Sequence, residues 1–207
     1  MAIKDAEPIE ALAALAPEEG QRRRFTRQEY HAMVDAGILD EDSRVELIEG
    51  TIIEMSPIRA PHSGAVNRLN ALLQARLGGQ VIVSVQNPFA SGEYSEPQPD
   101  VCLLKVKSDF YSTEHPLPSD ILLAIEVADT SLRYDRNVKM PLYASWGIAE
   151  AWIVNVSAGS LEVYRDPHAD GYRSLMKLSA GDAVSPLAFP DVTLDVAAIL
   201  PSAEEAK

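Results

Sequence analysis

The sequence contains one cysteine, Cys102, among its 207 residues. A single thiol cannot form a disulfide within the chain, so a disulfide-stabilised scaffold is excluded and a reducing compartment is expected. Long apolar runs are also missing, because no stretch approaches the roughly 20 residues that a membrane-spanning helix needs. The N-terminus lacks the basic region and the long apolar core of a signal peptide, which predicts a cytoplasmic protein.

Positive charge is scarce as well. The chain has 18 Lys and Arg residues against 31 Asp and Glu residues, which gives a formal net charge of −13. Because contacts with phosphate need a positive surface, this balance argues against a general nucleic-acid-binding protein. It does not exclude a local basic face, and it also agrees with a site that is crowded with metal-binding carboxylates.

Length and composition fit one domain with short extensions. The chain is long enough to bury a core, and 46% of its residues are hydrophobic. Its first residues are acidic and rich in Ala and Pro. We therefore predict a flexible acidic leader at residues 1–21, a single domain at 22–201 and a tail at 202–207.

Local signals predict a mixed α/β domain with one central sheet. Thr26 and Glu29 form a capping-box pattern at the start of a first helix. Pro61 begins a long second helix, and a third helix ends near Gly147, with Pro141 expected to kink it or to mark its early turns. Strands are predicted as a hairpin over 44–57, at 80–89, 98–106, 121–127, 150–156, 160–166 and 172–178, and close to the C-terminus before a final helical turn.

Two carboxylates lie beside strands that are predicted to be buried. Asp100 precedes the apolar run VCLL, and Glu126 lies near the end of ILLAIEV. Taken singly, Asp100 could cap the turn after Pro99 and Glu126 could pair with a nearby Arg or Lys. If the two strands are neighbours, both acids converge, and close carboxylates repel each other unless a cation lies between them. Such oxygen ligands suit Mg²⁺ or Mn²⁺.

Lys139 lies on the predicted helix that follows Glu126. One interpretation is a solvent-facing i,i+4 salt bridge with Asp135. The other is that Lys139 reaches back to the acids, where it would orient an attacking water or stabilise charge on phosphorus.

An ordered series of motifs runs through most of the chain. VELIEGTIIEMSP, His62 at the start of the long helix, QPD with its apolar strand, IEV followed by DTSLRYDRNVKMPLYASWGIAEAWIVN, and the closing FPDVTLDVAAIL together span about residues 25–200. With these blocks the chain resembles the PD-(D/E)XK nuclease superfamily, and within it the restriction-endonuclease branch called the Uma-two family. The resemblance implies a restriction-endonuclease-like core, in which a mixed central β-sheet is flanked by helices.

The resemblance also implies a set of site residues. Asp100 matches the motif aspartate and Glu126 the second acid, and both are expected to bind metal. The superfamily's lysine would stand two residues after the second acid, where this chain has Ala128, so the catalytic lysine is expected at Lys139. Glu46 matches an acid that other branches bring to the metal from an N-terminal element. A salt bridge of Glu46 with a neighbouring arginine, Arg44 or Arg68, is an equal alternative.

His62 and Gln98 are weaker candidates. His62 matches a histidine that is common in this family and could contact metal or phosphate, although a histidine at a helix start is more often a cap. The amide of Gln98 could point into the site, but an ordinary hydrogen bond at the end of a strand is the preferred interpretation. Tyr143 and Trp146, at helical spacing, are interpreted as core residues.

The leading functional hypothesis is a Mg²⁺-dependent (or Mn²⁺-dependent) endonuclease that hydrolyses phosphodiester bonds of DNA. A second hypothesis is a module that keeps the nuclease fold and binds nucleic acid or protein without cleavage, which the acidic charge and the displaced lysine favour. A third is a scaffold in which the acids serve only as ion pairs. A homodimer is expected, because cutting both strands of a duplex takes two sites.

Overall fold

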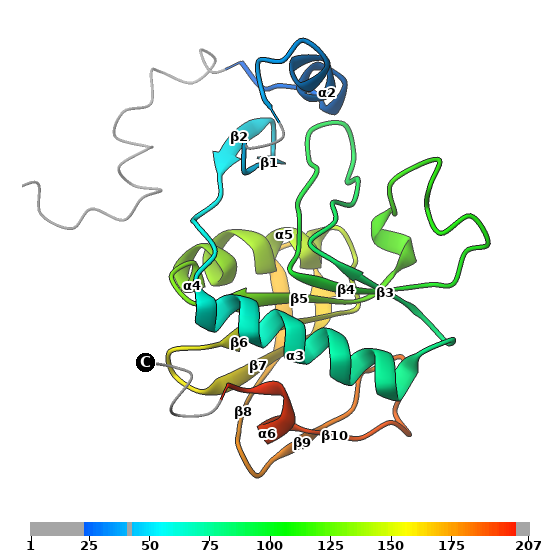
Figure 1. The fold of residues 1–207 in the computed structure, drawn as a ribbon, viewed down its shortest axis with the longest axis vertical. Coiled ribbons are helices and arrows are strands. Elements are labelled where there is room, and N and C mark those ends of the chain that lie inside the picture. Colours follow the sequence, from blue (N-terminus) through cyan, green and yellow to red (C-terminus); the bar gives the residue numbers. More distant parts are fainter. Residues whose placement is uncertain (1–22, 41–42, 202–207) are drawn as a thin grey trace, which may run out of the picture.

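A computed structural model describes residues 23–40 and 43–201, whose centre is a six-stranded sheet (Figure 1). The strands, in their order across the sheet, are β3 (Ile82–Val85), β4 (Val101–Leu104), β5 (Ile121–Ala128), β6 (Glu150–Asn155), β7 (Ser160–His168) and β8 (Gly171–Ser179). The pair β5 and β6 is parallel, and the other neighbouring pairs are antiparallel. The predicted mixed central sheet is therefore confirmed.

Helices cover both faces of this sheet. Helix α3 (Ala60–Leu77) crosses one face in Figure 1 and buries an apolar stripe that includes Leu69 and Leu73 against Leu103 and Ile125 of the strands. The opposite face packs against α4 (Leu132–Tyr134), the π-helical segment η2 (Asp135–Lys139) and α5 (Met140–Ser145). Strands β4 and β5 are thus buried on both sides, so a polar side chain on them needs a partner within the protein.

Proline interrupts the third helix, as predicted. Pro141 occupies the first turn of α5, directly after the π-helical segment η2. A proline has no backbone N–H to donate and its ring clashes with the preceding turn, so the regular α-helical hydrogen bonds cannot run through this point. The wider π turn accommodates the proline, and the N–H of Met140 donates to the carbonyl of Asp135 across it.

An N-terminal layer lies at one end of the molecule (Figure 1). It consists of α2 (Arg27–Asp35), which begins with the predicted capping box of Thr26 and Glu29, and of the hairpin β1 (Val45–Ile48) and β2 (Thr51–Glu54). The hairpin is a separate two-stranded sheet. A bridge between Leu47 and Glu96 joins it to the segment that leads into β4.

The C-terminal elements lie at the opposite end of the molecule in Figure 1. Strand β10 (Leu194–Asp195) and helix α6 (Val196–Ile199) confirm the predicted short strand and final helical turn, whereas the partner strand β9 (Ala183–Val184) was not predicted. A single 3₁₀ turn, η1 (Pro118–Asp120), precedes β5. Within residues 23–40 and 43–201, no helix is long and apolar enough to cross a membrane. The predicted leader and tail lie outside the described residues.

Candidate functional site

Asp100 and Glu126 lie on neighbouring strands of the central sheet. Strands β4 and β5 pair antiparallel, with Val101 opposite Ile125, so Asp100 comes one step further, opposite Glu126. Residues directly opposite each other in an antiparallel pair point to the same face. The next residue pair, Cys102 and Ala124, lies on the face that packs against α5, and the two acids share that face.

Asp100 is held by three donors. The backbone N–H of Val127 donates to Oδ2 at 2.8 Å, the amide of Gln86 donates to Oδ1 at 3.2 Å, and Nε2 of His62 lies 3.0 Å from Oδ1. Burial raises the pKa of Asp100. The hydrogen bond and the charge of His62, helped by the N–H of Val127, lower this pKa by more, so the net pKa lies below the ordinary value. Burial lowers the pKa of His62 and Asp100 raises it, with a net increase. The structure therefore favours an ionised Asp100.

Glu126 has a different environment, because it is only 3% exposed. The hydroxyl of Tyr143 donates to Oε1 at 2.5 Å, and the ammonium of Lys139 lies 3.3 Å from the carboxylate. Burial raises the pKa of Glu126 well above its ordinary value, and the nearby Lys139 opposes this only in part. Tyr143 is a core residue, as predicted, but its contact with Glu126 was not.

Lys139 lies between two glutamates. Its Nζ is 3.2 Å from Oε2 of Glu46 and 3.3 Å from Glu126, and its side chain is only 7% exposed. Burial lowers the pKa of Lys139, but the charges of Glu126, Glu46 and Asp135 raise it more, so its net pKa lies well above the ordinary value. Lys139 is therefore a buried ammonium and not a solvent-facing partner of Asp135, whose carboxylate instead accepts a hydrogen bond from Ser131 at 2.6 Å.

Gln98 contributes through its backbone. Its N–H donates to Glu46 at 3.1 Å, whereas its side-chain amide donates to the carbonyl of Gln86, the ordinary strand-end bond that we preferred. Glu46 thus joins β1 of the N-terminal layer to Lys139 on η2.

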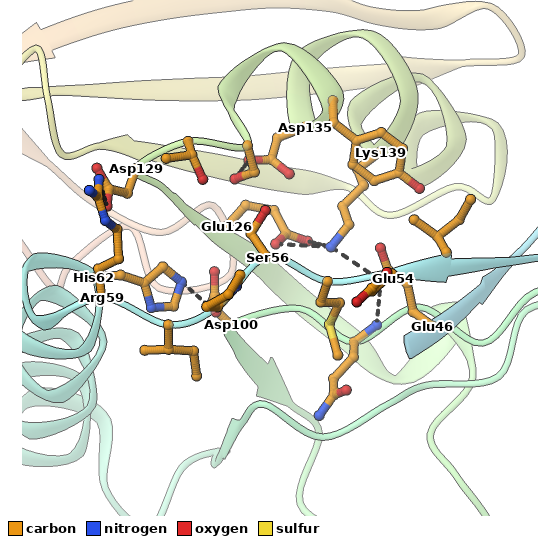
Figure 2. Close-up of a pocket in the computed structure, with 18 residues that line it drawn as sticks. Glu46, Glu54, Ser56, Arg59, His62, Asp100, Glu126, Asp129, Asp135 and Lys139 are labelled. Carbon is orange, nitrogen blue, oxygen red and sulfur yellow. Dashed lines mark hydrogen bonds and ion pairs between the residues drawn. The ribbon is translucent and has the colours of Figure 1, made fainter. Parts of the chain in front are cut away.

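All six candidates from the sequence line one pocket of about 300 Å³ (Figure 2). Figure 2 shows Asp100 and His62 on one side, Glu46 on the other, and Glu126 with Lys139 between them. The pocket also contains polar residues that the sequence analysis missed, namely Glu54, Ser56, Arg59, Asp129, Thr130, Ser131, Tyr134 and Asp135. The i,i+4 spacing of Ser131 and Asp135 is a local signal for the hydrogen bond that these two residues form.

Some polar atoms of this pocket lack partners. Within the described part of the chain, Nδ1 of His62, the hydroxyl of Tyr134 and Oδ2 of Asp129 are buried without a hydrogen bond. Arg59 approaches Asp129 Oδ2 only to 3.6 Å, an ion pair longer than a hydrogen bond. Buried polar groups are nearly always satisfied, so these three atoms are exceptions, and they belong to residues that line the pocket.

A comparison with known protein families shows to which family this chain belongs. Residues 27–197 match the Uma2 family, which is described as "Putative restriction endonuclease". The chain belongs to this family. The resemblance that the ordered motifs indicated is therefore confirmed, and the Uma2 match spans most of the described residues.

A solved structure supports the same fold. The crystal structure of "a putative nuclease belonging to DUF820" from Anabaena variabilis ATCC 29413 aligns with this Uma2 chain at a TM-score of 0.66. The alignment covers 84% of this chain and 97% of the other, at 14% sequence identity. At this identity the likeness shows a shared nuclease-like fold and nothing finer. A comparison with curated proteins gave no match.

The donor chemistry of the Uma2 pocket fits a hard divalent cation. Carboxylate oxygens are the ligands that Mg²⁺ and Mn²⁺ prefer, and Asp100 and Glu126 offer them from adjacent strands. Across the described residues, Glu46, Asp100 and Glu126 do not bring one oxygen each within 4.8 Å of one another, so the three acids do not form one compact cation site. Lys139 contacts both Glu46 and Glu126.

Proposed function

We propose that this chain is a metal-dependent endonuclease that hydrolyses phosphodiester bonds of DNA in the pocket between β1, β4, β5 and η2. The observation that carries the proposal is that Asp100, Glu126 and Lys139 line one pocket in a chain of a restriction-endonuclease family. Carboxylates that can hold a divalent cation, together with an ammonium that can stabilise developing negative charge, support metal-assisted phosphodiester hydrolysis.

We assign Asp100 and Glu126 as the residues that would hold Mg²⁺ or Mn²⁺. When bound, such an ion lowers the pKa of a coordinated water and neutralises charge that develops on the phosphate. Asp100 is prepared for this role because the N–H of Val127 and the side chain of His62 hold it ionised and oriented. Tyr143 orients Glu126 by donating to one of its oxygens.

Lys139 would orient the attacking water or stabilise charge on phosphorus. Glu46 keeps Lys139 charged and in place independently of Glu126, because its Oε2 lies 3.2 Å from Nζ. This contact supports a positioning role for Glu46, which would act through Lys139. His62 borders the same pocket, and its Nε2 lies 3.0 Å from Oδ1 of Asp100, so it would help to hold the metal-binding carboxylate in place.

Cleavage of supercoiled, linear and branched DNA, and of RNA, in Mg²⁺ or Mn²⁺ tests the proposal. We expect Asp100→Asn and Lys139→Met to lower the cleavage rate about a hundredfold or more, because the first removes a metal ligand and the second removes a positive charge that acts on the reacting phosphate. The matched control is Asp170→Asn, whose carboxylate is exposed and pairs with Arg173. Wild-type protein that leaves every substrate intact, or an Asp100→Asn variant as active as the control, would rule the nuclease out.

The alternative is a module that binds nucleic acid or protein without cleaving. The contacts of Lys139 with both Glu46 and Glu126 favour it, because an ammonium that already has two partners has less freedom to act on a substrate. The net charge of −13 favours a protein partner in that case. Binding of DNA or of a protein, with no cleavage of DNA in either Mg²⁺ or Mn²⁺, would support this alternative.

The proposal includes a homodimer. Cutting both strands of a duplex takes two sites, and two-fold dimers are the commonest oligomers. Light scattering at micromolar concentration measures the mass directly, and a monomer would contradict this part without affecting the assignment of the pocket.

A further inference from the structure

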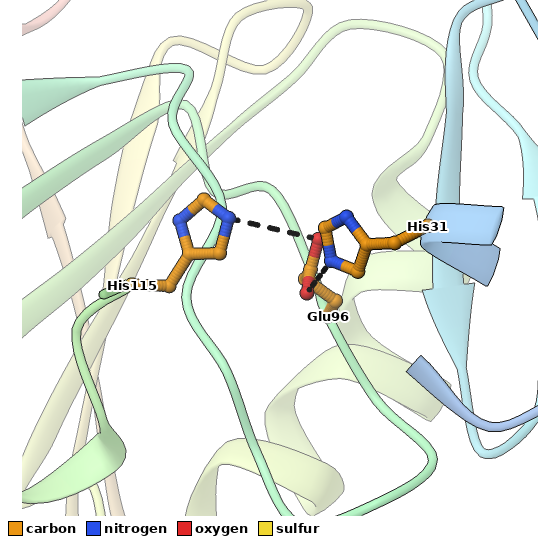
Figure 3. A group of neighbouring side chains, drawn as sticks. All are labelled: His31, Glu96 and His115. Atoms are coloured by element: carbon orange, nitrogen blue, oxygen red, sulfur yellow. Dashed lines mark hydrogen bonds and ion pairs between the residues drawn. The ribbon is translucent and has the colours of Figure 1, made fainter. Parts of the chain in front are cut away.

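Three potential metal ligands meet outside the candidate site (Figure 3). His31 comes from α2, Glu96 from the segment between β3 and β4, and His115 from the loop between β4 and β5. Nε2 of His31 lies 2.9 Å from Oε2 of Glu96, and Nε2 of His115 lies 3.9 Å from Oε1. Figure 3 shows the two rings pointing toward the carboxylate from either side.

We propose that His31, Glu96 and His115 bind one Zn²⁺-class transition-metal ion, which fastens α2 to the loop at residues 105–120. Two imidazoles and one carboxylate are a frequent ligand set for zinc and related ions, with water in the remaining positions. Such a set discriminates against Mg²⁺ and Ca²⁺, which prefer ligands that are all oxygen. The sequence has four histidines, and two of them, from segments far apart in the chain, converge on one glutamate.

The geometry is close to what a metal requires. The three ligand atoms lie within 4.8 Å of one another. Zinc–ligand distances of 2.0–2.2 Å place tetrahedral ligand atoms about 3.3 Å apart, so His115 would move toward Glu96 and His31 slightly away from it. The site is also accessible, because the side chains of His31 and His115 are 46% and 39% exposed while Glu96 is 4% exposed.

Charge balance alone does not explain the two histidines. Arg27 already neutralises Glu96, with its Nε 3.1 Å from Oε2, the oxygen that His31 contacts. A carboxylate oxygen has two lone pairs, so Oε2 can keep Arg27 and still bind a metal, and Oε1 faces His115. Both imidazoles offer ring nitrogens, which are ligands that a transition metal binds.

A metal at this place would stabilise an element that has few other attachments. Helix α2 has no buried residues, and polar contacts hold it, such as the N–H of Arg27 to the carbonyl of Glu93 and the hydroxyl of Tyr30 to the carbonyl of Val45. The N–H of Glu96 donates to the carbonyl of Leu47 on β1. The ion would thus connect α2, the hairpin and the loop at 105–120.

Calorimetric titration with Zn²⁺ alone tests the proposal. The protein to use is Asp100→Asn, so that binding in the candidate site does not contribute. We expect one Zn²⁺ per chain, an affinity that falls about tenfold or more when His31→Asn or His115→Asn is added, and a Zn²⁺-dependent rise in Tm that the same changes abolish. The control is His168→Asn, which replaces an exposed histidine paired with Asp166 and should bind Zn²⁺ normally.

Co²⁺ provides a second readout, because its visible absorption reports nitrogen ligands directly. Circular dichroism of the metal-free variants establishes whether each is folded. If the His31 or His115 variant unfolds, the Co²⁺ spectrum of the folded His168→Asn protein still tests whether the site binds metal. Absence of Zn²⁺ binding, or equal affinity in all histidine variants, would overturn the proposal. Either result is independent of Mg²⁺-dependent DNA cleavage.

Discussion

Lys139 is the residue whose role depends most on its surroundings. At i,i+4 from Asp135 it has the spacing of an ordinary surface salt bridge, for which a loss of about 0.3–0.5 kcal/mol on substitution is typical. The structure instead buries its ammonium between Glu46 and Glu126. Removing one partner of a buried ion pair leaves the other charge without compensation, which costs far more than losing a surface pair.

We therefore expect Lys139→Met to lower the free energy of unfolding by about 3–5 kcal/mol, measured by urea denaturation at neutral pH. Lys107→Met is the matched control, because that lysine is 43% exposed, pairs with the partly exposed Asp109 and should cost less than about 1 kcal/mol. Adding Glu126→Gln to Lys139→Met should restore part of the loss, since it removes the carboxylate left without a partner. If both lysine variants lost an equally small amount of unfolding free energy, Lys139 would behave as a surface ion pair and the prediction would be wrong.

At the scale of elements, the hairpin β1–β2 carries Glu46 to the pocket and depends on its turn. Glu49 and Gly50 have φ values of 50° and 79°, as in the two-residue turns that match the twist of paired strands. A Cβ on Gly50 would lie 2.5 Å from Cβ of Arg24, whose guanidinium also donates to the carbonyl of Glu49. The glycine thus permits both the turn and the close approach of Arg24.

Gly50→Ala should lower the free energy of unfolding by about 1–3 kcal/mol, because it combines a left-handed backbone with a steric clash. Gly64→Ala, within α3, is the opposite case: an added Cβ meets nothing within 4 Å there, and alanine favours the helix. We expect that variant to gain up to about 1 kcal/mol. Denaturant unfolding measures both, and a Gly50→Ala protein as stable as wild type would contradict the account of the turn.

At the scale of the whole molecule, stability should depend on pH through Glu162. This carboxylate on β7 is 1% exposed and accepts hydrogen bonds from Arg136 of η2, at 2.9 Å from Nε, and from the hydroxyl of Tyr164 at 2.7 Å. Burial raises the pKa of Glu162, but the bonds from Arg136 and Tyr164 lower it more, so the net pKa is below the ordinary value. The interaction joins the helical segment to the far half of the sheet.

A lowered pKa means that the stabilisation is complete above the unfolded value of about 4.5 and is lost as the pH falls through the lower, folded value. Glu162→Gln should therefore cost about 1.5–3 kcal/mol at pH 7, and the difference from wild type should shrink below pH 4.5. Unfolding measured across this pH range tests it, with the exposed Glu114→Gln as control. A difference that stays constant down to the lowest pH would contradict the prediction.

The local elements and the family could be predicted from the sequence alone. The capping box of Thr26 and Glu29, the hairpin over residues 44–57 and the early-turn position of Pro141 are decided by residues within a few positions of one another, so their chemistry can be read directly. The ordered motifs also identified the family, because each block retains its place in the chain.

Only the tertiary structure decided which side chains contact one another in the candidate site and in the proposed metal site. The bond from Tyr143 to Glu126, the two glutamates around Lys139 and the meeting of His31 with His115 all join segments that no local pattern relates. Such contacts depend on strand register, on the π turn before Pro141 and on how loops return over the sheet. Local preferences act over a few residues, whereas burial and pairing are settled only when the whole chain packs.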